Sequence, residues 1–486
     1  MAPLDQLICI HGHFYQPPRE NPWLEEVEAQ PSAHPYHDWN ERITAECYGP
    51  LAALGLYAKI SFDFGPTLLS WLERKAPAVY ESIRRSDQES RGNFSGHGSA
   101  MAQAYNHIIL PLANHRDRVT QVAWGIRDFE FRFGRRPEGM WLPETAVDLE
   151  TLEILAERGI LFTVLAPHQA GRVRPLSSGS WHSVSGERID PSQAYLLRLP
   201  SGRKIHLFFY QGTLSRAVAF EKLVTQGEIF AKKLLGAFSG KAAGPQLVHI
   251  ASDGETYGHH FPGGDQGLAE AIRRIEAGGP ARLTNYGEHL ERHPATHEVE
   301  IVEKSSWSCT HGVDRWWSDC GCNAGAPADW NQSWRTPLRD ALDWLRDSVA
   351  PRFEQAAAGI FKDPWAARDR SIELILERSP EGAQRFLEEQ AARPLEKMER
   401  DRALKLLELQ RQALLMYTSC GWFFNDISGI EAVQILQYAA RAIQLAEELF
   451  GDPLESEFLK ILMQARSNRP ECGDGRQVYE ASVMIR

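Results

Sequence analysis

The densest group of chemically competent side chains follows a short apolar run. Leu247–Ser252 leads into Asp253-Gly-Glu255-Thr-Tyr-Gly258-His259-His260. Residues two apart on a strand point to the same face, so we expect Asp253 and Glu255 on one side if the strand continues. The two glycines permit the sharp turns of a site loop. So many titratable groups after a buried strand predict a functional site.

A second acid also stands where an apolar run stops. Gly139-Met-Trp141-Leu-Pro143-Glu144 reads as a short strand that ends in proline, which removes a ladder donor. Glu144 is therefore expected at the rim of a sheet, just before a helix that starts near Asp148. It is a candidate for catalysis, although an acid there would also stabilise the N-terminus of that helix.

Histidines complete the set of candidates. His11 and His13 share one face at the end of the first apolar run, where they could bind a metal or hydrogen-bond a sugar hydroxyl. The alternative is that one of them is a satisfied core histidine. His97 and His107 carry a weaker signal, because a single histidine is more often a buried polar residue than a member of a site. Of these two, His107 is included among the predicted substrate contacts.

Two carboxylates beside one cleft suit glycoside hydrolysis. One carboxylate attacks the sugar or activates water, and the other protonates the leaving oxygen. The proton donor needs a raised pKa, which burial and a like-charged neighbour supply. Glu144 and Asp253 are the predicted pair.

The elements that must position these residues alternate along the first two thirds of the chain. The predicted strands are 7–13, 59–64, 139–142, 161–166, 205–210 and 247–252, with a weaker one near 93–96. The predicted helices are 66–86, 116–133, 148–158, 228–238 and 265–277. Strands that alternate with helices imply a parallel sheet covered by helices, and about seven such units favour a closed or nearly closed barrel.

From about residue 336 the pattern becomes helical. Segments 337–358, 363–377, 382–416, 429–450 and 454–465 are amphipathic. The last residues, 478–486, look like the beginning of a strand, so we expect the chain to stop inside a longer protein. The domains predicted are a catalytic domain over 1–300, a Trp- and Cys-rich bridge over 301–335 and an α-helical domain over 336–486.

Composition restricts the class of partner. The formal net charge of −11 disfavours nucleic acid and anionic membranes, which need a basic surface. No apolar stretch is long enough to span a bilayer, and the first residues do not resemble a signal peptide. The seven scattered cysteines suit a reducing compartment, so a cytoplasmic location is expected.

Three motifs in this order resemble glycoside hydrolase family 57, which contains α-amylases, 4-α-glucanotransferases, amylopullulanases, an α-galactosidase and branching enzymes. They are His11-Gly-His13 with Gln16-Pro17, Trp141-Leu-Pro-Glu144, and Asp253-Gly-Glu255-Thr-Tyr-Gly258-His259. The resemblance covers roughly residues 5–335. The stretch from Met416 to Phe424 looks like a helical extension found on one branch of that family.

The resemblance implies a (β/α)7 barrel and a retaining double displacement that uses no metal or other cofactor. It assigns the nucleophile to Glu144 and the acid/base to Asp253. Glu255 and His259 would support Asp253 or bind sugar hydroxyls, and His11, His13 and Trp141 belong to substrate-contacting motifs. The expected substrate is an oligo- or polysaccharide of α-linked glucose.

The chain departs from the family pattern in three places. Phe14-Tyr15 is inserted before Gln16-Pro17, Gly96-His97-Gly98-Ser99 replaces a segment that usually carries a glutamate, and His260-Phe261 stands where an aromatic pair is expected. These segments contact substrate, so the departures bear on which sugar is bound more than on the two carboxylates.

The segment 305–334 holds five of the 14 tryptophans. Such a cluster suits stacking on sugar rings, with Trp316 and Trp317 as the favoured contacts, or a packed loop core between domains. Cys309, His311, Cys320 and Cys322 could form a zinc site, but the spacing lacks paired Cys-x-x-Cys hooks, and we predict no metal.

Two other functions remain open at this point. A metal-dependent deacylase or mannosidase-type hydrolase on a similar barrel would take ligands from His11, His13, His97, Asp253 and His259, but it leaves Glu144 without a role. A non-catalytic carbohydrate-binding protein would retain the cleft alone. Linkage, the balance of hydrolysis and transfer, and oligomeric state stay open.

Overall fold

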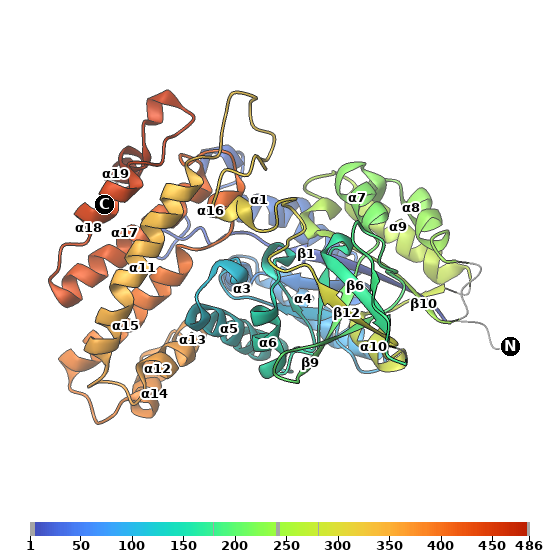
Figure 1. Ribbon diagram of the computed structural model, residues 1–486, viewed down its shortest axis with the longest axis horizontal. Coiled ribbons are helices and arrows are strands. Elements are labelled where there is room, and N and C mark those ends of the chain that lie inside the picture. Colours follow the sequence, from blue (N-terminus) through green and yellow to red (C-terminus); the bar gives the residue numbers. More distant parts are fainter. Residues whose placement is uncertain (1–4, 178, 240–243, 280, 484–486) are drawn as a thin grey trace. The chain divides into compact units, whose positions relative to one another are not determined.

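The computed structural model describes residues 5–177, 179–239, 244–279 and 281–483. Contacts divide the chain into two compact units (Figure 1). The first comprises Met1–Gln16, Ala29–Ala104 and Phe129–Trp307, and the second comprises Pro17–Glu28, Tyr105–Asp128 and Ser308–Arg486. The predicted domain boundaries at 300 and 335 stay predictions.

Within the described residues, the first unit is built on seven parallel strands. Five of them pair in the order β10, β1, β2, β3, β4, and a single parallel bridge from Gly139 to Phe162 leads on to β5, which pairs with β9. Just beyond β9, the amide of Gln211 donates to the carbonyl of His249 in β10 at 2.8 Å. The strands are β1 (Gln6–Phe14), β2 (Ser61–Phe64), β3 (Ala100–Gln103), β4 (Met140–Trp141), β5 (Phe162–Leu165), β9 (Lys204–Phe209) and β10 (Gln246–Asp253). The predicted α/β barrel-like fold is confirmed.

The sequence explains why these strands are central. β1 and β10 are buried along almost their whole length, as parallel strands covered on both faces must be, and each contains an apolar run before the polar residues at its carboxyl end. The short strand β11 (Ala281–Leu283) pairs with the beginning of β1. The helices of this unit are α1 (Trp39–Ile43), α2 (Gly49–Ala53), α3 (Pro66–Lys75), α4 (Pro77–Asn93), α6 (Leu149–Glu157), α7 (Gly212–Phe220), α8 (Gly227–Leu235), α9 (Gly264–Ala277) and α10 (Tyr286–Arg292).

A smaller, mostly antiparallel extension was not predicted. β8 (Tyr195–Arg198) pairs with β9, and it is followed by β12 (His297–Ile301), β6 (Ala170–Pro175) and β7 (His182–Ser183). Among its described residues, only β12 and β8 pair in parallel. After β12 the chain returns to the barrel, where the amide of Val147 donates to the carbonyl of Ser305 at 3.0 Å. This return places the next residues of the chain beside the segment that carries Glu144.

The second unit is helical, as predicted. The long helices α15 (Lys397–Leu415) and α17 (Ile430–Phe450) pack against each other, and α11 (Arg335–Ala357) packs on α18 (Glu455–Leu462) (Figure 1). The helix α5 (His115–Phe133) begins in this unit and ends in the first. The other helices are α12 (Pro364–Arg370), α13 (Ile372–Leu376), α14 (Pro380–Gln390), α16 (Cys420–Phe423) and α19 (Gly475–Val483).

Several predicted elements need correction. The weak strand near 93–96 is the end of α4 and a turn, and the third strand of the barrel is β3 instead. The predicted strand at 478–486 is wrong as far as residue 483, because α19 covers that stretch; residues 484–486 lie outside the described part of the chain. Two long predicted helices are each divided, one before Pro77 and one around Pro394, because proline lacks the amide that a helix interior requires.

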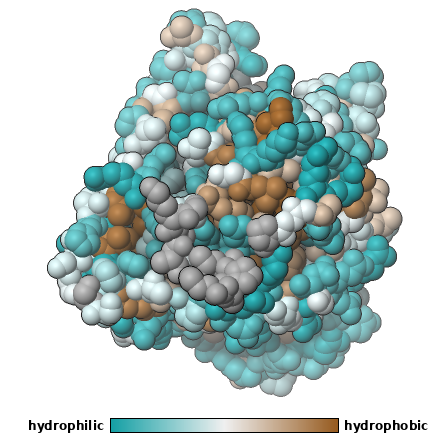
Figure 2. Space-filling model, turned by 90° about the vertical axis from the view of Figure 1, so that its right-hand side faces the viewer, coloured by the Kyte–Doolittle hydropathy of each residue, from teal (hydrophilic) through white to brown (hydrophobic). Residues whose placement is uncertain are grey.

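The surface shows no extended apolar area on the face seen in Figure 2. That face is mostly hydrophilic, and its hydrophobic residues lie in small separate groups. Among the residues that the structure describes, no helix combines the length and the apolar character needed to cross a bilayer.

Candidate active site

Several candidate residues lie beside one another at the carboxyl ends of the central strands. His13 of β1 is the register partner of Asp253 in β10 on one side and of Asp63 in β2 on the other. In the next two strands of the sheet, Gln103 of β3 is in register with Trp141 of β4. Active sites of β/α barrels lie at this end of the strands.

Asp63 is the residue that organises this edge, and sequence reasoning missed it. Its side chain is completely buried, and its two oxygens are bonded to His11 Nε2 at 3.0 Å and to His13 Nδ1 at 2.8 Å. Gln103 Nε2 donates to the second oxygen at 2.7 Å. His11 is also bonded through Nδ1 to the hydroxyl of Ser61 at 3.0 Å. Both nitrogens of His11 are therefore used within the protein.

The buried pair of Asp63 and His13 is charged. Burial works against the imidazolium of His13, but the neighbouring Asp63 carboxylate outweighs it and raises the pKa of His13 to about 9. Burial likewise works against the ionised form of Asp63, but the two histidines lower the pKa of that carboxyl. Burial lowers the pKa of His11. A cationic His13 thus lies next to Asp253 at neutral pH.

The Asp63–His13 pair makes stability depend on pH in a defined window. The folded pKa of His13, about 9, exceeds the usual 6.5, so its contribution is complete below about pH 6.5 and is lost as pH rises through 9. We expect Asp63→Asn and His13→Gln each to abolish this loss, which amounts to about 3 kcal/mol in the free energy of unfolding. Urea unfolding of the wild type and of each variant, measured from pH 6 to pH 10, tests this. Identical pH slopes in wild type and variants would contradict it.

Glu144 adopts a strained backbone conformation. Its φ is 57° and that of Thr145 is 51°, so two consecutive residues with side chains lie in the left-handed region. They form a short turn over Pro143–Thr145 directly after β4. Strain of this kind persists only where the surroundings enforce it, and it concentrates at functional sites.

Trp307 and Gln169 hold this turn in place. The amide of Trp307 donates to the carbonyl of Glu144, and its indole Nε1 donates to Glu144 Oε2, both at 3.0 Å. Gln169 accepts from the hydroxyl of Thr145 and donates to its carbonyl, both at 2.9 Å. The Glu144 carboxylate is therefore oriented by a hydrogen bond, and its side chain is only half-buried.

Aromatic rings line the same region. Trp141 is completely buried and stacks on His11 and His13 with ring centroids 4.7 Å and 5.2 Å apart. Trp307 meets the Trp141 ring edge-on at 5.2 Å. The sequence pointed to Trp141 and His13 as substrate contacts. In the structure, the stacked rings of Trp141 and His13 also hold each other in position.

Asp253 ends β10 in a position suited to a proton donor. Its side chain is accessible to solvent, and among the described residues it accepts no hydrogen bond. The protein atoms packed around it disfavour the charged form and raise its pKa; Asp63 adds to this rise and His13 opposes it. The next residue must be glycine, because a Cβ at Gly254 would lie only 2.2 Å from the Phe14 ring.

Glu255 is held behind Asp253 as a second perturbed acid. Its Oε1 accepts from the hydroxyl of Tyr48 at 2.5 Å and from the amide of Tyr15 at 3.1 Å. Burial raises the pKa of Glu255 to about 7, and the Asp253 charge adds to that rise. The ionisation of each carboxyl therefore affects that of the other.

This coupling gives a pH prediction for catalysis. The Asp253 charge raises the pKa of Glu255, and because repulsion between two charges is mutual, an ionised Glu255 also disfavours the ionisation of Asp253. We expect Glu255→Gln to move the alkaline limb of kcat/KM to lower pH, because the negative neighbour is removed. Glu291→Gln, an exposed glutamate bonded to His97, is the matched control and should leave the limb in place. An unchanged alkaline limb in Glu255→Gln would refute the coupling.

Two other histidines from the sequence have partners of their own. His259 is half-buried, and its Nδ1 is bonded to Glu46 Oε2 at 2.5 Å. His97 precedes β3 and so lies at the amino ends of the strands, where it is bonded to Glu138 at 2.8 Å and to Glu291 at 3.0 Å. His97 was considered for the site because the third strand was placed too early.

Three predicted contacts belong to the second unit. His107 is buried, and its Nδ1 is bonded to Ser419 Oγ at 2.7 Å. Trp316 is completely buried, whereas Trp317 is 43% exposed and so is the one of this pair with an open ring. Contact of these three residues with a sugar stays a prediction.

Comparison with known proteins identifies the family. The sequence model described as glycosyl hydrolase family 57 matches residues 18–302, which is more than half of the chain. The chain belongs to glycosyl hydrolase family 57. A second model, described as a domain of unknown function (DUF3536), matches residues 330–486. The resemblance read from the three motifs is thereby confirmed, and the protein is a glycoside hydrolase by family.

Individual relatives are distant. Alpha-amylase 1 of Dictyoglomus thermophilum is 28% identical over 106 residues, which is 22% of this chain and 15% of that protein. An exo-type maltose-forming amylase from Pyrococcus sp. ST04 superposes with a TM-score of 0.70 at 15% identity, covering 98% of this chain and 88% of the other. A family-57 branching enzyme from Pyrococcus horikoshii gives 0.56 at 16% identity, with 98% and 94% covered. At these identities the structures establish a shared fold.

Proposed function

We propose that this family-57 protein is a retaining enzyme of α-linked glucans, with Glu144 as the nucleophile and Asp253 as the acid/base. The observation that carries the proposal is the pairing at one edge of the barrel of an oriented, strained Glu144 with an Asp253 whose pKa is raised. The substrate class is supported by the amylases and the branching enzyme that share the family or the fold.

The proposed reaction has two steps. In the first, a Glu144 oxygen attacks the anomeric carbon, the glycosidic bond breaks, and the leaving oxygen takes the proton of Asp253. In the second, Asp253 removes a proton from water or from an acceptor sugar, which displaces Glu144 from the anomeric carbon. Water gives hydrolysis, and a sugar hydroxyl gives transfer.

The surrounding residues have supporting roles in this scheme. Trp307 donates a hydrogen bond to Oε2 of Glu144 and so fixes the direction of this carboxylate. The cationic His13, held by Asp63, adds positive charge next to Asp253 and stabilises negative charge that develops there. The Asp253 charge in turn raises the pKa of Glu255, so the two carboxylates repel each other when both are ionised.

Neither alternative function is favoured. Among the residues that the structure describes, the histidines and acids at this edge of the barrel form no cluster with metal-binding distances, and His11 uses both ring nitrogens within the protein. A binding protein without catalysis would not need two carboxylates, one strained and one with a raised pKa. All seven cysteines are free thiols, which supports a reducing, cytoplasmic location as part of the proposal.

The test is a product analysis with maltoheptaose and amylose. Purified protein should convert both into shorter or redistributed oligosaccharides, and Glu144→Gln should yield none. Hydrolysis gives only shorter products and a new reducing end for each bond cleaved, whereas transfer gives products longer than maltoheptaose together with shorter ones. If the wild type converts neither glucan, the α-1,4-glucan assignment is wrong.

A further inference from the structure

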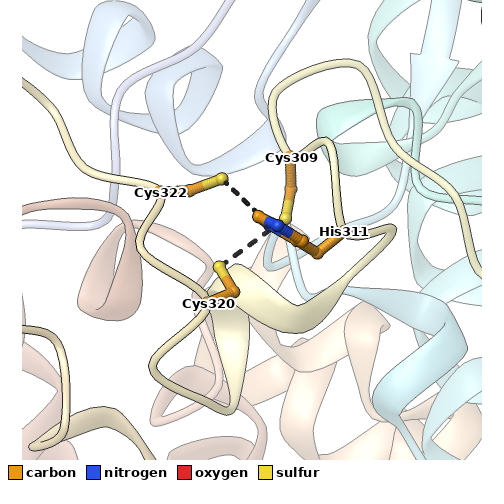
Figure 3. A group of neighbouring side chains, drawn as sticks. All are labelled: Cys309, His311, Cys320 and Cys322. Carbon is orange, nitrogen blue, oxygen red and sulfur yellow. Dashed lines mark hydrogen bonds between the residues drawn. The ribbon is translucent and has the colours of Figure 1, made fainter.

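Four potential metal ligands meet in the loop that precedes α11, in the second unit. Cys309, His311, Cys320 and Cys322 each offer one ligand atom, and these four atoms all lie within 4.8 Å of one another. Figure 3 shows the three sulfur atoms and the imidazole directed toward a common centre. Cys309 is buried, and Cys320 and Cys322 are half-buried. The catalytic carboxylates play no part in this group.

Two of the separations between the ligand atoms agree with tetrahedral zinc. Zinc–sulfur bonds of about 2.3 Å and zinc–nitrogen bonds of about 2.05 Å give tetrahedral edges of about 3.8 Å between sulfurs and about 3.6 Å between sulfur and nitrogen. The Cys309 and Cys320 sulfurs are 3.9 Å apart, and the Cys322 sulfur is 3.6 Å from His311 Nδ1. A disulfide would need about 2.05 Å between the sulfurs. The cysteines are free.

The loop geometry explains why the sequence spacing understated this group. The ligands come as Cys309-x-His311 and Cys320-x-Cys322, two hooks that are each one residue shorter than Cys-x-x-Cys. Gly312 and Gly321, both with φ near 80°, turn the chain beside each hook. The short helix Asp314–Trp316 lies in the interval between the two hooks.

A buried arginine supplies a second, independent observation. Arg335 is completely buried, and it donates to the carbonyls of Cys322, Trp422 and Phe424 at 2.9 Å, 3.0 Å and 3.4 Å. Within the described residues it forms no ion pair with a carboxylate. Zn²⁺ with three thiolates and a neutral imidazole carries one net negative charge. A buried cation bonded to the backbone of a ligand residue suits a centre of that charge.

We propose that Cys309, His311, Cys320 and Cys322 bind one zinc ion in a closed Cys3His site with a structural role. All four positions are filled by protein atoms, so no position is left for water or substrate. The ion fixes the loop 308–334 against the beginning of α11 and against α16, to which Arg315 also bonds through the carbonyl of Phe423. This inference does not depend on the proposed glucan chemistry.

Metal analysis of protein purified without chelators tests the site. We expect about one zinc ion per chain by inductively coupled plasma mass spectrometry, with iron and other metals well below that. Cys320→Ser and His311→Ala should lower the zinc content several-fold. Cys472→Ser, a half-buried cysteine elsewhere in the same unit, is the matched control and should retain it. His311→Cys should also retain zinc, because a fourth thiolate replaces the imidazole.

Two further results separate zinc binding from loss of fold. Reduced wild-type protein loaded with Co²⁺ should show the thiolate charge-transfer and visible bands of a tetrahedral cobalt site, and Cys320→Ser should not. Removal of zinc with a chelator should lower the thermal unfolding midpoint of the wild type but not that of Cys320→Ser. Wild-type protein that holds no zinc as purified and takes up none when it is added would overturn the proposal. Full zinc content in Cys320→Ser, or a Cys309–Cys320 disulfide in the unreduced protein, would overturn it as well.

Discussion

Replacement of Glu144 by Ala or Gln lowers kcat/KM for maltoheptaose by about 10⁴-fold or more, because the first bond to the sugar is made by this carboxylate. The loss should appear in kcat, since the nucleophile contributes little to binding of the ground state. Glu157→Gln, the same change at an exposed position at the end of α6, should keep wild-type activity. Initial rates for the three proteins, with circular dichroism to show that they are folded, give the comparison.

The identity of the nucleophile has a stereochemical consequence. With maltosyl fluoride of α configuration, leaving-group protonation is unnecessary, and azide can occupy the space freed in Glu144→Ala. Azide would then attack from the face that Glu144 normally uses, and the product should be the β-glycosyl azide. Formation of the α-azide, or rates in Glu144→Ala within about tenfold of wild type, would exclude Glu144 as the nucleophile.

Replacement of Asp253 by Asn has an effect that depends on the leaving group. We expect a loss of about 10²- to 10⁴-fold on maltoheptaose, whose leaving oxygen needs a proton. With maltosyl fluoride the first step should survive, so the glycosyl-enzyme should form and accumulate because no base activates water. Steady-state rates on the two substrates, together with the initial burst of fluoride release, measure this difference.

Two comparisons strengthen the Asp253 experiment. Added azide should restore turnover of maltosyl fluoride by Asp253→Asn and give the α-azide, since it attacks the glycosyl-enzyme from the leaving-group face. Asp190→Asn, an exposed aspartate of the same unit, should behave as the wild type. Equal losses on the glucan and on the fluoride would contradict a proton-transfer role for Asp253.

The two candidate carboxylates could be predicted from the sequence, whereas some of the buried side chains around them were not predicted. Glu144 and Asp253 could be found because each follows an apolar run and stands in a recognisable motif. Asp63 carried a signal that was overlooked, since an acid within the predicted strand 59–64 must be buried and therefore paired. Its partners His11 and His13 come from another strand, and only the parallel register places them beside it.

The missed elements have physical causes. β3 is four residues long and reads Ala-Met-Ala-Gln, which is a weak strand pattern, so the strand was placed at the end of α4 and Gln103 was not considered. Trp307 was recognised as part of a tryptophan cluster, but its hydrogen bonds to Glu144 require the return of the chain after β12. The zinc cluster depends on two glycine turns that sequence spacing alone does not reveal.

The central claim is a covalent bond between the sugar and Glu144, and mass spectrometry of the trapped intermediate tests it most directly. Asp253→Asn is incubated with maltosyl fluoride, quenched with acid and digested with a protease. We expect the mass of one maltosyl group on the peptide that contains Glu144, and no such label in the Asp253→Asn, Glu144→Gln double variant. A label on another residue, or an unlabelled protein that releases product of inverted anomeric configuration, would contradict the account.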